Sequence, residues 1–293
     1  MGDFRLKLWV GIGASLLAGG AAAPVLADPQ PAKPGVAASG TTAQAAPGAH
    51  GHGAHGQAKP GEGGEGGEGG EGGEAGALAG LPPQAAFAAQ LHLMLGHLRV
   101  GQELLDQKRP EDAVFHFLHP AEEIYGGIAD ELAARKVPAF QAELEALAAL
   151  VEKRAPVKDV AAARARVTAA IDRALATVPA AEGASAGFTL TVAIGLLRTA
   201  AEEYAAAIED GRFKLAVEYQ DSRGFVWQAR ALVEARADAF RAKDADAYSQ
   251  ILATFNDLQK AWPGALPPTA PIVPAADVAA AVSRIELRAG RFS

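Results

Sequence analysis

The sequence predicts an all-α protein: two tandem up-down four-helix units, after a signal peptide and a disordered segment rich in Gly, His and Glu. Hydrophobic residues make up 49% of the 293 residues and aromatic residues only 6%, so the apolar residues are mostly Ala, Leu and Val. Ala and Leu favour helix, whereas β-rich folds draw on aromatic and β-branched residues. From Gln84 onward, apolar residues recur at helical spacings of three and four.

Residues 1–27 have the pattern of a cleavable secretory signal peptide. Arg5 and Lys7 precede an apolar stretch over 8–23, and Val25-Leu26-Ala27 is typical of a cleavage site, which predicts cleavage after Ala27. The apolar stretch is short for a membrane span of ~20 residues. We therefore expect a periplasmic protein with no transmembrane segment in the mature chain.

Residues 28–83 are predicted to be a disordered linker, because they show no hydrophobic period that could build a core. Two biased tracts lie within them: one carries His50, His52 and His55, and the other repeats Gly-Gly-Glu from Glu62 to Glu74. One interpretation is a plain flexible linker. The other is a weak metal-collecting tail, since clustered imidazoles bind divalent transition metals.

Residues 84–180 are predicted to form the first helical bundle. The helices are identified by their apolar stripes: Phe87, Leu91, Met94, Leu98 and Leu105; then Val114, Phe117, Ala121, Ile124, Ile128 and Leu132; then Phe140, Leu144, Leu147 and Val151; then Val160, Val167, Ile171 and Leu175. Short connections between such helices favour an up-down bundle.

Residues 181–293 are predicted to form a second bundle by internal duplication, with helices over 188–209, 211–236, 239–260 and 274–288. The repeat also shows at residue level. Gly96-x-Leu98-Arg99-x-x-x-Glu103 matches Gly195-x-Leu197-Arg198-x-x-x-Glu202.

The candidate chemistry depends on histidine, because the chain has no cysteine. That absence excludes disulfides, cysteine–zinc sites and thiol nucleophiles. Outside the tail, every histidine falls in the first two helices. His116, His119 and Glu123 share one helical face, Glu122 follows His119 by three residues, and His97 can face them from the preceding helix. Imidazoles and carboxylates at such spacings form metal sites in helical bundles.

The two glutamates can have a role other than metal binding, and the second unit has candidate ligands of its own. Pro120 forces a kink or a restart of the helix, and after a restart both glutamates would occupy a first helical turn, where the helix dipole favours acids. The second unit offers Glu218 and Asp221 as oxygen ligands for a site of its own, or as an ordinary polar face.

The signal peptide, the tandem helical units and His119-Pro120-Ala121-Glu122 together resemble the imelysin family and the related periplasmic iron-uptake lipoproteins called EfeO. The resemblance covers the architecture from Gln84 to Ser293. It implies a duplicated helical bundle whose His-x-x-Glu residues are associated with metal.

The sequence therefore predicts a periplasmic protein that binds iron, or zinc or copper(II), for uptake, delivery or sequestration. The expected partners are a metal ion and another envelope protein. The net charge of −7 gives no reason to expect nucleic acid. The alternative is a helical-repeat adaptor without metal chemistry, since Pro110–Ala113 resembles the turn of a helix-pair repeat. Nothing supports a substrate, so an enzyme ranks third.

Overall fold

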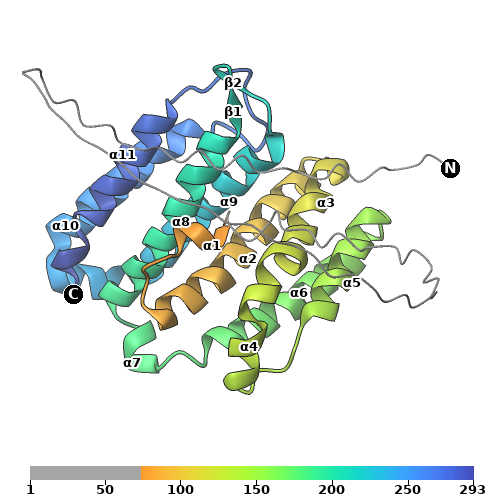
Figure 1. Ribbon diagram of the computed structural model, residues 1–293, viewed down its shortest axis with the longest axis horizontal. Helices are drawn as coiled ribbons and strands as arrows, with labels where there is room; N and C mark the ends of the chain where they lie inside the picture. Colours follow the sequence, from red (N-terminus) through yellow and green to blue (C-terminus); the bar gives the residue numbers. More distant parts are fainter. Residues whose placement is uncertain (1–73) are drawn as a thin grey trace, which may run out of the picture. The chain divides into compact units, whose positions relative to one another are not determined.

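The computed structural model describes residues 74–293, which form an all-α fold with one small β-hairpin (Figure 1). The expected signal peptide and the tail residues His50, His52 and His55 lie outside the described residues. Within residues 74–293, no helix is long and apolar enough to cross a membrane.

The helices come in the predicted order. The elements of the first part are α1 (Glu74–Ala77), α2 (Pro83–Asp106), α3 (Pro110–His119), the π-helical turn η1 (Pro120–Ile124), α4 (Tyr125–Ala134), α5 (Gln141–Glu152) and α6 (Val157–Leu175). Those of the second part are α7 (Ala180–Gly183), α8 (Ala186–Ala206), β1 (Ile208–Glu209), β2 (Arg212–Phe213), α9 (Ala216–Glu234), α10 (Ala237–Leu258), the 3-10 turn η2 (Gln259–Ala261), α11 (Ala275–Glu286) and the 3-10 turn η3 (Ala289–Arg291).

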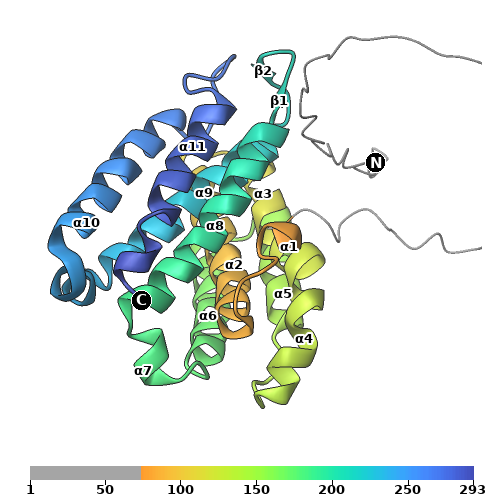
Figure 2. The same ribbon diagram turned by 60° about the vertical axis from the view of Figure 1, so that its left-hand side comes forward.

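Helices α2, α8 and α9 occupy the middle of the fold that residues 74–293 form. In Figure 1, α10 and α11 lie on one side of them and α4, α5 and α6 on the other, and Figure 2 also shows α10 and α11 on the side opposite α4 and α5. Helix α2 contacts both α8 and α9, although they come from the other half of the sequence. Most of the apolar stripe predicted for α2 is buried, with Phe87, Leu91, Met94 and Leu98 each at most 3% exposed, and Leu105 is half-buried.

Three helices of the first part end in the same way. Lys108, Lys136 and Arg154 follow α2, α4 and α5 in the left-handed conformation, with φ between 51° and 59°. After each of them the next backbone N–H returns to a carbonyl five residues earlier, as in Arg109 N–H to Leu104 O. This Schellman-type ending closes the helix without glycine.

Two elements differ from the sequence prediction. Residues 208–213 form an antiparallel hairpin in which Ile208 pairs with Phe213, so α9 begins at Ala216 and not near Gly211. Asp210 and Gly211 both have positive φ, as an Asp-Gly hairpin turn requires. The last part of the expected linker is also ordered: α1 begins at Glu74, and Leu78 is buried. Leu78 packs into the core beside Gly195 of α8, where a Cβ on the glycine would lie 2.9 Å from the Leu78 side chain.

Candidate metal centre

Three histidines from two helices converge on one carboxylate from a third. His97 lies on α2, His116 and His119 lie on α3, and Asp221 lies on α9. One ligand atom from each of the four residues can be chosen so that all lie within 4.8 Å of one another. The centre thus joins the His-rich first part of the sequence to an acid of the second part.

Small residues make this convergence possible. A Cβ on Gly224 of α9 would lie 2.4 Å from the backbone oxygen of Gly96 on α2, so the two helices cross at a distance that only glycine permits. A Cβ on Gly101 would lie 2.8 Å from the Phe117 ring, which lets α3 approach α2 in the same way. Gly96 directly precedes His97, and Gly224 follows Asp221 by three residues.

A polar clamp fixes the register of α2 and α9 beside the centre. Arg223 Nε and Nη2 donate to the two carboxylate oxygens of Glu103, each at 2.9 Å. The Arg223 guanidinium also lies 3.9 Å from the centre of the Trp227 ring. Because Asp221 is two residues before Arg223 on α9, this clamp also fixes the axial position of Asp221 relative to α2.

All three imidazoles present Nδ1 to Asp221. His97 Nδ1 and His116 Nδ1 each lie 2.6 Å from Oδ1, and His119 Nδ1 lies 3.1 Å from Oδ2. Asp221 is 2% exposed, and a buried carboxylate needs such partners because isolated charges are costly in a protein interior.

Two further side chains engage the far nitrogens of these rings. His116 Nε2 donates to Gln220 Oε1 at 2.8 Å. His119 Nε2 lies 3.7 Å from Glu123 Oε1. Gln220 is buried, and its Nε2 has no hydrogen-bond partner within residues 74–293.

The electrostatics follow from this clustering. Burial alone would raise the pKa of Asp221, but the charges of His97, His116 and His119 outweigh it and hold that pKa well below its usual value. Burial lowers the pKa of His119, but the charge and hydrogen bond of Asp221 raise it to about 9. A metal ion at this position would have to displace protons from the imidazoles, so binding would release protons.

The donor set fits a transition-metal ion. Imidazole nitrogen and carboxylate oxygen suit iron, zinc and copper(II), whereas copper(I) prefers sulfur ligands. The set has no sulfur ligand.

The structure places the candidate ligands of the sequence analysis in two groups. It brings His97, His116 and His119 together, with Glu123 at the edge, 41% exposed. Glu122 is exposed and lies outside the cluster, and so does Glu218. The carboxylate comes instead from Asp221, which joins the first-part histidines and not a second-unit site. The sequence analysis did not identify Gln220, and its position next to Asp221 in the sequence is the available signal.

Of the two outcomes expected at Pro120, the restart of the helix does not occur. The helix continues through it as a π turn in which Tyr125 N–H bonds to Pro120 O, five residues back. Proline cannot donate the preceding helical bond, and the wider turn accommodates it. Such π turns inside helices occur frequently at functional sites.

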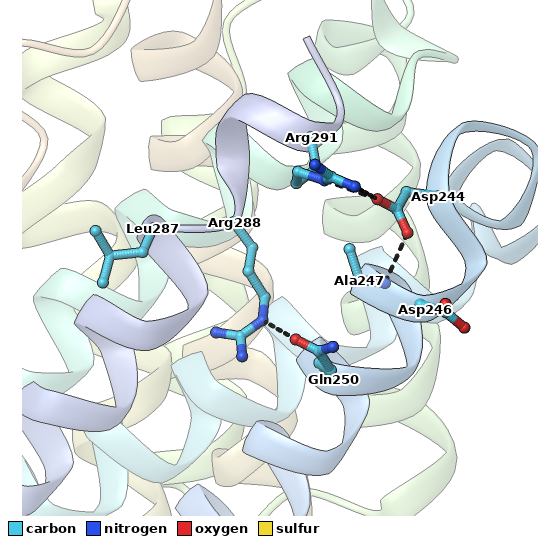
Figure 3. Close-up of a pocket in the computed structure, with 7 residues that line it drawn as sticks. All are labelled: Asp244, Asp246, Ala247, Gln250, Leu287, Arg288 and Arg291. Atoms are coloured by element: carbon cyan, nitrogen blue, oxygen red, sulfur yellow. Dashed lines mark hydrogen bonds and ion pairs between the residues drawn. The ribbon is translucent and has the colours of Figure 1, made fainter.

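A separate open cleft of about 500 Å³, lined by none of the histidines, lies between α10 and the segment that follows α11 (Figure 3). There Arg291 pairs with Asp244 at 2.6 Å, and Arg288 Nε donates to Gln250 at 2.9 Å. Both arginines thus have partners within the protein, so the buried cluster is the stronger candidate for a ligand site.

Comparison with protein families gives a match to part of the chain. Residues 179–291 match the family described as iron permease-associated 4-helix bundle domain, which covers less than half of the chain. No curated protein and no solved structure matches the chain significantly. The matched stretch contains Asp221 but none of the three histidines. The family is helical and metal-related, which is compatible with the resemblance to imelysin and EfeO but does not confirm it.

Proposed function

We propose that this protein binds a transition-metal ion, with iron as the first candidate and zinc or copper(II) as alternatives, at His97, His116, His119 and Asp221. The observation that carries the proposal is the convergence of three imidazoles on one buried carboxylate. A protein gains little stability from such a buried polar group. A bound cation would explain the arrangement, because it would replace the protons on the imidazoles and stabilise the buried Asp221 carboxylate.

Iron is favoured by the context of the match. The iron permease-associated family covers α8 to α11, the stretch that supplies the carboxylate. Together with the expected signal peptide, this supports a role in uptake, delivery or sequestration of iron in the periplasm. The partner would be the metal ion and, by the same reasoning, a membrane component of an iron-uptake system.

The test is metal titration of the full mature chain with Fe²⁺ under anaerobic conditions and with Zn²⁺, followed by calorimetry. We expect one ion per chain. Asp221→Asn should lose affinity by more than about 100-fold, since loss of an outer-shell partner alone costs roughly 10–100-fold. Asp130→Asn, at an exposed position on α4, is the matched control and should bind like the wild type.

Two results would contradict the proposal: no binding by the wild type, or equal binding by Asp221→Asn. The adaptor alternative predicts the first of these results. A protein without metal chemistry would show no difference between the two aspartate variants in this experiment.

A further inference from the structure

The residues of the centre are buried to different degrees, and the centre is most open to solvent on one side. The side chains of His97 and His116 are 0% exposed and that of Asp221 is 2% exposed. His119 is 15% exposed, and Glu123 beside it is 41% exposed. Among these residues, solvent therefore reaches the centre most readily at His119 and Glu123.

His119 bridges the inside and the outside of the centre. Its Nδ1 lies 3.1 Å from the buried Asp221 carboxylate, and its Nε2 lies 3.7 Å from the exposed Glu123 carboxylate. Glu123 stands one turn after His119, on the π turn that begins at Pro120. One imidazole ring thus separates an exposed acid from a buried one.

We infer that metal ions enter and leave the centre on this side, with Glu123 making the first contact and His119 the next. The inference rests on the proposed function. An incoming dication is hydrated and must lose water before it meets buried ligands. An exposed carboxylate attracts it and partly replaces that water, which lowers the barrier in both directions. Glu123 is then a positioning residue for exchange and not a ligand of the bound ion.

The test separates rates from affinity. Co²⁺ is the probe, because its visible absorption reports coordination by imidazole and carboxylate. Stopped-flow mixing of the full mature chain with Co²⁺ gives the association rate, and displacement by a chelator gives the release rate. For Glu123→Gln, both rates should fall by about ten-fold, within the range seen for electrostatic steering. The dissociation constant should change by less than about three-fold.

Glu122→Gln is the matched control. It removes the same charge one residue away, at an exposed position outside the cluster. Both of its rates should stay close to those of the wild type, because the inferred role needs a carboxylate placed against His119 Nε2, where it can contact the ion directly, and Glu122 lies outside the cluster.

Three outcomes would overturn the inference while the proposed function stands: unchanged rates in Glu123→Gln, equal slowing in Glu122→Gln, or faster release with an unchanged association rate. The last would mean that Glu123 is a ligand. Failure of the wild type to bind Co²⁺, Zn²⁺ or Fe²⁺ would instead remove the proposed function and the inference with it.

Discussion

At the scale of single residues, the candidate centre depends on the Asp221 carboxylate and the three imidazoles around it. The histidines could be predicted, since they gather in two helices and since His116 and His119 are three residues apart. Asp221 was identified only as one possible oxygen ligand of the second unit. Its meeting with the histidines could not be predicted, because one sequence gives no contact between residues 105 positions apart such as His116 and Asp221.

Gln220 should tune the affinity without touching the metal ion. It accepts a hydrogen bond from His116 Nε2, which leaves Nδ1 directed at the centre. We expect Gln220→Leu to weaken metal binding by roughly 10–100-fold, as loss of an outer-shell partner does. Gln220→Glu keeps an acceptor oxygen and should bind like the wild type. Equal affinity in all three proteins, measured by competition with a chelator, would show that this hydrogen bond has no such role.

His92 on α2 should make the fold acid-sensitive. Burial lowers its pKa from 6.5 to about 4. Between these values the unfolded chain binds a proton at His92 and the folded chain does not, so stability falls as the pH drops from about 6.5 to about 4. In His92→Gln this loss should be shallower. The measurement is the free energy of unfolding in urea across that pH range, and identical pH slopes would contradict the expectation.

At the scale of elements, most helices could be predicted, but the close packing of one helix against another could not. The apolar stripes and the prolines at their starts indicate α2, α3, α5, α6 and α11 with useful accuracy, because both signals are local. The π turn at Pro120 and the hairpin at Asp210-Gly211 are local as well, but each competes with a stronger helical pattern around it. The crossing of α2 and α9 depends on Gly96 meeting Gly224, which no local signal reveals.

Gly224→Ala should disturb the centre through this crossing. Its Cβ would meet the backbone oxygen of Gly96 at 2.4 Å, and backbone cannot move aside cheaply. Overpacking of this kind costs typically about 1–3 kcal/mol of stability. The shift of α9 should also move Asp221 from the histidines and weaken metal binding.

The control is Gly127→Ala on α4, where a Cβ meets nothing within 4 Å. It should raise stability by up to about 1 kcal/mol through helix propensity alone. Both effects are measured by denaturant unfolding and by metal titration. A Gly224→Ala protein with unchanged stability and unchanged affinity would contradict the close-crossing account.

At the scale of the whole molecule, the candidate centre connects two parts of the chain that the sequence predicts to be separate bundles. Helices α2 and α3 supply the imidazoles and α9 supplies the carboxylate. A metal ion held by all three would act as a crosslink between residues far apart in sequence. The duplication and the bundle boundaries at residue 180 remain predictions.

Metal binding should therefore stabilise the fold. A ligand that binds only the folded state adds about 2.7 kcal/mol at a free concentration 100 times its dissociation constant. We expect Zn²⁺ to raise the free energy of unfolding of the wild type by this order and a chelator to reverse it. Asp221→Asn should show no such gain, and an equal gain in both proteins would place the stabilising metal elsewhere.

The central claim is that His97, His116, His119 and Asp221 hold one metal ion, and X-ray absorption on the metal-loaded full mature chain tests it most directly. The account predicts one ion per chain and a first shell that contains three imidazoles and at least one oxygen. The same measurement on His116→Ala should show one imidazole fewer or no bound ion. A shell without imidazole in the wild type, or one that His116→Ala leaves unchanged, would contradict the account.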